Sequence, residues 1–345
     1  MPGLGSRIAQ RLLFPPKSLL DWLTRKPKVV DGEAIDRHAQ WILAVANATD
    51  RSMPSMGPRG ARRYYAQLSW LLEGQPPEIE EARDVELNMR DGNTCRARVY
   101  RPKGTPASKP LPGLVFFHGG GHTIGSIETH DVFCQRLCAG SGCIVVSVNY
   151  RLAPEEPFPA ALHDSYDATV DVARRADEFG IDPGRLAVGG DSAGGNLAAA
   201  VSIVARDEQG PPICLQLLIY PGVGGIDHPG RQNPGLQEGF GLDAKTTRWF
   251  YENYLGDHTD ADPRFSPLFL ENHAGLPPAL VVIAHFDVLR GEGIEYAEKL
   301  EAAGVPVTRL RYADLLHGFV TMSVLPRAAE AITEIAESLR VLHGD

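Results

Sequence analysis

Ser192 stands in the run GGDSAGGN, Gly189 to Asn196, where Gly190 and Gly194 complete the pattern Gly-x-Ser-x-Gly. This pattern is typical of a tight turn from a strand into a helix, because the glycines let the backbone turn without a Cβ clash. A serine exposed on such a turn can act as a nucleophile toward a carbonyl carbon. The pattern is short enough to occur by chance, so the hypothesis depends on what the rest of the chain supplies.

A nucleophilic serine needs a general base, and the chain has 11 histidines. The chain order serine, acid, histidine, which is typical of hydrolases with this turn, leaves His273 and His317 as candidates. His273 precedes the last two expected strands, whereas His317 lies in the loop DLLHGF between the final strand and the last helix. We therefore expect His317 to be the base, since histidine side chains ordinarily titrate near pH 6.5 and can accept a proton at neutral pH.

A carboxylate at Nδ1 would hold the imidazole of that base in one tautomer. Asp287 ends the run PALVVIAHFD, so it would project from the carboxyl end of a neighbouring strand. Asp314 is the rival because it lies three residues before His317, and Glu292 is a weaker rival because it begins an expected helix. We favour Asp287, since an acid as close as Asp314 would more readily shape its own loop than reach the far ring nitrogen.

A second glycine run follows the expected strand GLVFF, where His118 is followed by Gly119, Gly120 and Gly121. Consecutive glycines leave backbone N–H groups open toward a ligand, so this loop could stabilise negative charge on a carbonyl oxygen. We expect the N–H groups of Gly120, Gly121 and Ala193 to be the donors, with Gly119 as the alternate. A run of this kind before the serine turn is where an oxyanion loop belongs.

The candidate residues lie near the ends of short apolar runs that alternate with helix-length segments. The runs are 113–119, 143–150, 185–191, 213–221, 278–287 and 307–312, after a hairpin of 82–89 and 94–102. The alternation predicts an α/β fold with a mostly parallel sheet, covered by helices on both faces. Functional loops of such a sheet lie at the carboxyl ends of its strands.

The chain divides into core and cap segments. Residues 1–75 are helical in pattern with no strand, and we expect them to form an N-terminal cap segment. Residues 76–220 and 266–345 would form the two parts of the core. Residues 221–265 contain no clear core strand and follow a strand's carboxyl end, so we expect an insertion that covers the site together with the N-terminal helices.

Composition excludes several classes of partner. The net charge of −9, with no block of Lys or Arg, argues against nucleic acid and against an anionic membrane surface. The five cysteines lack Cys-x-x-Cys spacing, so we expect neither a disulfide framework nor a metal site, and a cytoplasmic location fits best.

No run approaches the roughly 20 apolar residues of a transmembrane helix. The mildly amphipathic segment Ile8 to Leu23 could cover the pocket, meet a partner or rest on a membrane, the first being the default.

Five motifs together resemble the hormone-sensitive-lipase-like esterases, also called bacterial family IV carboxylesterases. They are HGGG at 118–121, YRLAPE at 150–155, GDSAGG at 190–195, FDVLR at 286–290 and HGF at 317–319. The resemblance runs from about Pro54 to the C-terminus. It implies an eight-stranded α/β-hydrolase core with a helical cap, no cofactor, and hydrolysis of short- to medium-chain acyl esters. It also implies that the serine, histidine and favoured aspartate form a catalytic triad, with the three glycines and Ala193 as the oxyanion hole.

The chain departs from this family in two places. The family usually reads DPLRDEG where residues 287–293 read DVLRGEG, which could loosen the turn that aims the acid. His122 stands where the family tends to have Trp or Phe, which argues against a purely apolar acyl pocket. We expect His122, with Trp249, Phe250 and Tyr254 of the insertion, to line the substrate pocket.

The sequence thus predicts a serine carboxylesterase that acts on a small-molecule ester through an acyl-enzyme. Two other classes stay open. One is a non-catalytic receptor on the same scaffold, as in the plant gibberellin receptors, which resemble this family but lack the triad histidine; His317 counts against it. The other is an interfacial lipase that uses its N-terminal segment at lipid surfaces. Amide hydrolysis is a nearer variant, and a homodimer is an open expectation because family members often dimerise.

Overall fold

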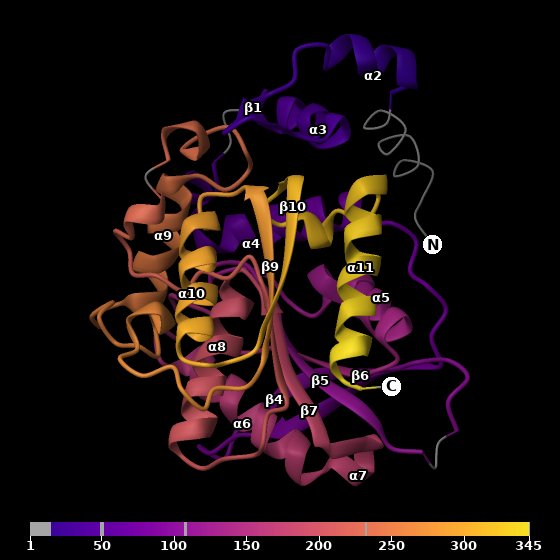
Figure 1. Cartoon of the computed structure of the whole chain (residues 1–345), viewed down its shortest axis with the longest axis vertical. Coiled ribbons are helices and arrows are strands. Elements are labelled where there is room, and N and C mark those ends of the chain that lie inside the picture. The colour runs from indigo at the N-terminus through magenta and orange to yellow at the C-terminus, as the bar shows by residue number, and fades with distance from the viewer. Residues whose placement is uncertain (1–14, 49–51, 107–108, 232, 345) are drawn as a thin grey trace.

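An eight-stranded sheet runs through the middle of the molecule. The computed structural model describes residues 15–48, 52–106, 109–231 and 233–344 (Figure 1). The strands, in the spatial order β10-β9-β8-β7-β5-β6-β4-β3, are β3 (Glu81–Asn88), β4 (Thr94–Arg101), β5 (Leu111–Phe117), β6 (Ile144–Val148), β7 (Ile181–Asp191), β8 (Leu215–Ile219), β9 (Ala279–Phe286) and β10 (Val307–Leu316). β5 to β10 are mutually parallel, and β4 is antiparallel to both of its neighbours. The predicted α/β-hydrolase sheet is confirmed.

Burial explains why the central strands read as unbroken apolar runs. Every residue of β6, β8 and β9 is buried, because helices cover both faces of a parallel sheet and leave no solvent side. The edge strand β3 has only one buried residue, Leu87. The bounds of the strands predicted from these apolar runs lie within a few residues of the observed bounds.

Helices cover the two faces of the sheet in separate layers (Figure 1). They are α5 (Asp131–Ser141), α6 (Ala160–Arg174), α7 (Ala176–Phe179), α8 (Ala193–Asp207), α10 (Arg290–Ala302) and α11 (Pro326–Leu342). Short 3-10 turns occur in the connections between elements: η1 (Glu128–His130), η2 (Pro229–Arg231), η3 (Pro234–Leu236), η4 (Pro267–Phe269) and η5 (Phe319–Thr321). The apolar residues of α6, α8 and α10 belong to one buried cluster, whereas those of α5 and α11 belong to another. The sheet thus separates two cores.

Four further helices lie toward the carboxyl ends of the strands. They are α2 (Lys17–Leu23), α3 (Arg37–Asn47), α4 (Met53–Leu72) and α9 (Ala244–Leu255). Figure 1 shows α2 and α3 above the arrowheads of β9 and β10, and α4 contacts α9 although the two are far apart in sequence. Within the described ranges, none of the helices combines the length and apolar character that a membrane crossing needs. The part of the amphipathic segment before Pro15 lies outside the described residues.

The N-terminal region also contains a strand pair that the sequence did not predict. β1 (Val29–Val30) and β2 (Glu33–Ala34) pair antiparallel across a two-residue turn. Asp31 and Gly32 at the turn have φ of 49° and 84°, which is the hairpin geometry that favours Asp-Gly. The expectation of no strand in residues 1–75 was wrong, because strands of two residues are too short to show alternation.

Candidate active site

Ser192 occupies the turn between β7 and α8. Its φ of 55° and ψ of −117° lie in a region that side-chain-bearing residues rarely adopt, so the surrounding structure must hold it there. The Ser192 N–H donates to the carbonyl of Ile219 in β8 at 2.8 Å. A Cβ at Gly190 would lie 2.3 Å from the carbonyl carbon of Gly194, so the two glycines are required by the close approach of the chain to itself. The sequence prediction of a strained strand-to-helix turn is confirmed.

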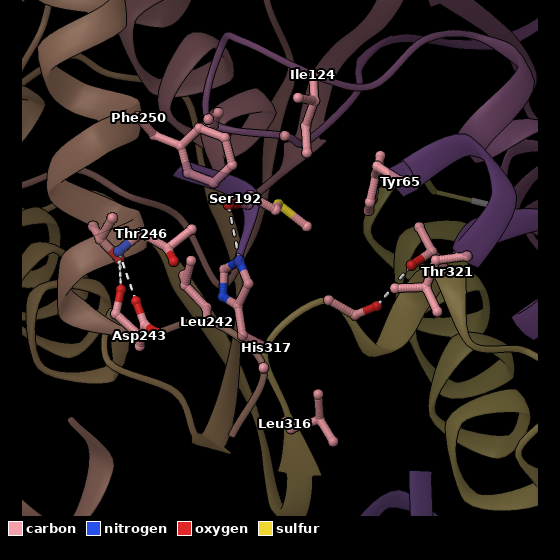
Figure 2. Close-up of a pocket in the computed structure, with 18 of the residues that line it drawn as sticks. Tyr65, Ile124, Ser192, Leu242, Asp243, Thr246, Phe250, Leu316, His317 and Thr321 are labelled. Carbon is pink, nitrogen blue, oxygen red and sulfur yellow. Dashed lines mark hydrogen bonds between the residues drawn. The ribbon is translucent and has the colours of Figure 1, made fainter. Parts of the chain in front are cut away.

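His317 joins the serine to an acid. Its Nε2 lies 2.9 Å from Ser192 Oγ, as Figure 2 shows, and its Nδ1 lies 2.8 Å from Asp287 Oδ2. Asp287 follows β9 and His317 follows β10, so neighbouring parallel strands deliver them to the same edge of the sheet. The buried Asp287 is aimed by a second hydrogen bond, because its Oδ1 accepts the Leu289 N–H at 2.8 Å. The loop therefore holds the acid without the proline and second aspartate of the related sequences.

The rival residues have other partners. Asp314 accepts a hydrogen bond from Arg327 Nε at 3.0 Å. Glu292 is fully buried in an ion pair with Arg231. His273 packs edge-on against Tyr296, with ring centroids 5.5 Å apart. The structure thus brings Ser192, His317 and Asp287 together and leaves the three rivals outside this group.

The loop after β5 and the residue after Ser192 border the same cavity. Gly120 and Gly121 have φ of 119° and 57°, and the carbonyl of Gly120 accepts the N–H groups of Thr123 and Ile124, which closes the turn. No acceptor in the described part of the chain binds the N–H groups of Gly120, Gly121 or Ala193, and all three residues line the cavity above the serine. The sequence favoured these three N–H groups as oxyanion donors, and that assignment stays a prediction.

The alternate donor, Gly119, has a different partner. Its N–H donates to Asp191 Oδ1 at 2.8 Å, so this donor is already paired within the protein. A side chain at Gly119 would also be impossible, since its Cβ would lie 2.4 Å from Asp191 Oδ2. Gly119 therefore fixes the loop to the serine turn and is not available to an oxyanion.

Asp191 is a buried acid behind this loop. Besides Gly119, His130 Nε2 lies 3.1 Å from its Oδ1, and the Tyr220 hydroxyl donates to its Oδ2 at 3.4 Å. Burial by itself would raise the pKa of Asp191, but the His130 imidazole and the Gly119 N–H outweigh it and lower the pKa below its ordinary value. The carboxylate stays ionised and so keeps its hold on the loop.

His118 completes the buried support of the loop. Its ring stacks on Tyr150, with centroids 4.3 Å apart, and the Tyr150 hydroxyl donates to the His118 carbonyl at 2.6 Å. Burial, reinforced by the nearby His130, lowers the pKa of His118 to about 3, so its imidazole is neutral at physiological pH. The ring acts as a rigid spacer under the glycine loop.

Arg62 of α4 reaches the same loop from the other side. Its Nε donates to the Thr123 carbonyl at 2.8 Å, and its Nη2 donates to the Ala153 carbonyl at 2.9 Å. Nη1 also donates to Glu155 Oε1 at 2.9 Å. One guanidinium thus ties an N-terminal helix to both the glycine loop and the YRLAPE loop.

A cavity of about 280 Å³ lies in front of Ser192 and His317 (Figure 2). Side chains of three helices contribute to its lining: Ile42 and Leu43 of α3, Met53, Tyr64, Tyr65, Leu68 and Leu72 of α4, and Thr246, Thr247, Phe250 and Tyr251 of α9. Apolar atoms provide most of the lining, which suits the hydrocarbon part of a small ligand. Within the described residues no group of three or more His, Cys, Asp or Glu side chains is arranged to hold a metal ion.

Two of the four predicted pocket residues line the cavity. His122 and Phe250 do so, and Phe250 lies so close to Gly121 that a Cβ there would be 2.1 Å from its ring. Burial, reinforced by His118, lowers the pKa of His122 to about 3, so it adds a neutral polar group. Tyr254 is not in the lining because it stacks behind His122, with centroids 3.7 Å apart. Trp249, one position round α9, packs beside Phe250 on an apolar cluster instead.

Comparison with known proteins agrees with this architecture. Residues 114–321 match a family model described as alpha/beta hydrolase fold. The chain is 46% identical over 349 residues to the carboxylic ester hydrolase LipN of Mycobacterium tuberculosis, a match that covers 98% of this chain and 90% of LipN. The chain belongs to the hormone-sensitive-lipase-like alpha/beta hydrolases. The resemblance inferred from the motifs is therefore confirmed.

Two further proteins resemble the chain, one in sequence and one in sequence and structure. Esterase LipI of Mycobacterium tuberculosis is 44% identical over 278 residues, which cover 78% of this chain and 85% of LipI. The structure of an ester hydrolase from the metagenome of Lake Arreo, complexed with a bipyridine phosphonate derivative, superposes with a TM-score of 0.83 at 37% identity. That match covers 89% of this chain and 97% of the hydrolase.

Proposed function

We propose that this family member is a serine carboxylesterase that hydrolyses carboxylic esters of short- to medium-chain acids. The observation that carries the proposal is His317, whose two ring nitrogens contact Ser192 Oγ and Asp287 Oδ2 at hydrogen-bond distance. The names of the relatives LipN and LipI, an ester hydrolase and an esterase, support the same activity.

The proposed reaction proceeds through an acyl-enzyme. His317 Nε2 accepts the proton of Ser192 Oγ as that oxygen attacks the ester carbonyl carbon. The N–H groups of Gly120, Gly121 and Ala193 donate to the oxygen that becomes negative. His317 then protonates the leaving alcohol, and in the second half of the reaction it deprotonates a water that cleaves the acyl-enzyme. Asp287 keeps the proton on Nδ1 and stabilises the imidazolium.

The proposal assigns substrate selection to a cap formed by residues 1–75 and 221–265. Its helices α3, α4 and α9 supply the apolar lining described above. A cavity of about 280 Å³ is slightly smaller than the roughly 300–1,000 Å³ of typical ligand pockets, which favours small esters over triglycerides. The neutral His122 is a polar exception in this lining.

Hydrolysis of p-nitrophenyl esters from acetate to dodecanoate tests the proposal. Wild-type turnover should peak at short to medium chains, and Ser192→Ala should lower kcat by about 10⁴-fold or more, since the nucleophile is lost. Circular dichroism of both proteins controls for folding. A fluorophosphonate should label the wild type and not the variant. A non-catalytic receptor would not label, an interfacial lipase would prefer emulsified long-chain esters, and undiminished turnover by Ser192→Ala would remove the mechanism.

A further inference from the structure

Arg231 and Glu292 form an ion pair inside the molecule, between the insertion and the helix that follows Asp287. The side chain of Arg231 is 7% exposed and that of Glu292 is 0% exposed. Arg231 Nε donates to Glu292 Oε1 at 2.7 Å, and Nη2 donates to Oε2 at 2.9 Å. This two-point contact fixes the plane of the guanidinium as well as its position.

The remaining donors of Arg231 hold one loop and one aromatic side chain. Nη1 donates to the carbonyls of Gly225 and Ile226 at 2.6 and 2.8 Å, and Nη2 donates to the Gly224 carbonyl at 3.0 Å. Nη2 also donates to the Tyr251 hydroxyl of α9 at 2.8 Å. The Gly224 N–H in turn donates to Glu292. The ion pair therefore organises loop 224–226 and fixes Tyr251 against it.

Tyr251 connects the Arg231–Glu292 ion pair to the wall of the substrate cavity. Tyr251, Gly222 and Leu289 line the cavity, and a Cβ at Gly222 would lie 2.9 Å from the Tyr251 hydroxyl. The Gly222 N–H donates to the Ser192 carbonyl at 3.3 Å. Any movement of Tyr251 thus changes the cavity wall next to the serine.

We propose that Arg231 is a positioning residue for ester selectivity, which it sets by fixing Tyr251 and loop 224–226 to α10. This role rests on the proposed esterase function. A buried ion pair gives little net stability over apolar residues of similar size, so stability alone does not account for the pair. Six acceptors instead surround the five N–H donors of this guanidinium, and together they define a single position for the α9 wall.

The double variant Arg231→Met/Glu292→Met tests this role, because removal of both charges leaves no unpaired buried ion. We expect kcat for p-nitrophenyl acetate and the rate of fluorophosphonate labelling to stay within about 3-fold of wild type. The ratio of kcat/KM for hexanoate to that for acetate should fall about 10-fold, through KM, since a chain that reaches the α9 wall loses its fit. An unchanged ratio in the folded double variant would overturn the role.

Two further variants keep the result interpretable. Arg90→Met/Asp167→Met removes an ion pair with a buried acid, neither member of which lines the cavity, and should leave the ratio unchanged. Tyr251→Phe keeps the ring but removes the hydroxyl that Arg231 contacts, so it should lower the ratio about 2- to 3-fold even where the double variant does not fold. A wild-type ratio in Tyr251→Phe would also overturn the role. If the wild type neither hydrolyses esters nor labels, the proposed function itself fails.

Discussion

The floor and the roof of the cavity are held by different interactions. The floor consists of Ser192, Ala193 and loop 119–121, and buried hydrogen bonds to Asp191 and Ile219 hold it in place. The roof consists of the cavity-facing side chains of α3, α4 and α9, which meet mainly through apolar contacts, with the hydrogen bond from Arg231 to Tyr251 as a polar exception. Backbone atoms present the donors at the floor, whereas side-chain volume shapes the roof.

This difference predicts two kinds of mutational response. Hydrogen-bonded geometry admits one arrangement, so a change at the floor alters interactions made in the transition state and lowers kcat. Apolar packing tolerates substitutions of similar volume, so a change at the roof alters which substrates fit. Activity and selectivity should therefore be separable by mutation.

Asp287→Asn should show the largest effect beyond loss of the serine itself. The amide would favour the wrong tautomer of His317, so we expect kcat to fall by about 10⁴-fold with p-nitrophenyl butyrate. Asp314→Asn is the matched control, because Asp314 contacts Arg327 and not His317. Equal losses in the two variants, or a larger loss in Asp314→Asn, would contradict the assignment of the acid.

Asp191→Asn should show the next largest effect. The amide keeps an acceptor for the Gly119 N–H but removes the negative charge that faces His130. We expect kcat to fall by roughly 10- to 100-fold, less than the 10²- to 10³-fold that follows loss of an oxyanion donor. Steady-state kinetics below the variant's Tm measures this effect. A change confined to KM would show that the loop stays in place without the charge.

Phe250→Leu tests the roof. Phe250 lies against Gly121 and lines the cavity, but it makes no hydrogen bond to the proposed catalytic groups. We expect kcat for p-nitrophenyl acetate to stay within about 3-fold, while the preference for hexanoate over acetate rises up to about 10-fold, because the cavity gains room for methylene groups. A loss of kcat as large as that of Asp191→Asn would abolish the distinction between floor and roof.

Glu73→Gln should have the smallest effect, on stability and not on catalysis. Burial, reinforced by repulsion from Asp131, raises the pKa of Glu73 at the end of α4 to about 8. The folded state therefore binds this proton more tightly than the unfolded state, and the contribution to stability is lost as pH rises from about 4.5 to 8. The Gln variant should gain roughly a few degrees of Tm over wild type at pH 8.5 and almost none at pH 4.5. Parallel Tm curves of the two proteins would contradict the raised pKa.

The floor was predictable from sequence because backbone geometry demands particular residues there. A Cβ at Gly190 or Gly194 would lie within 2.4 Å of backbone atoms, so the turn requires glycine at both positions and the two glycines mark it directly. The order of the strands then brings the chain after β9 beside the chain after β10, which is why Asp287 and His317 could be paired in advance. The hydrogen bond from Gly119 to Asp191 could not be predicted, because it depends on the pairing of β5 with β7, which sets Gly119 against Asp191.

For the roof, the sequence predicted the helices but not which of their side chains face the cavity. The sequence identified α9 and the N-terminal helices, but the face that each presents depends on tertiary packing. Phe250 faces the cavity, whereas Trp249 and Tyr254 pack behind it. The cavity-facing residues of α3 and α4, such as Leu43 and Leu68, were not singled out, although their helical apolar spacing marked them as buried on some face. The spacing of apolar residues predicts which side chains are buried, but only the folded structure shows what each of them packs against.

Arg62 limits how this enzyme family could be engineered by exchange of parts. The residue belongs to the N-terminal helix α4, yet its guanidinium holds the carbonyls of Thr123 and Ala153 on core loops. A chimera that took its first 75 residues from a relative, to import another selectivity, would therefore also replace a support of the glycine loop that we propose as the oxyanion loop. Grafts that keep Arg62 and its three acceptors should transfer selectivity, and grafts that lose them should transfer selectivity at reduced kcat.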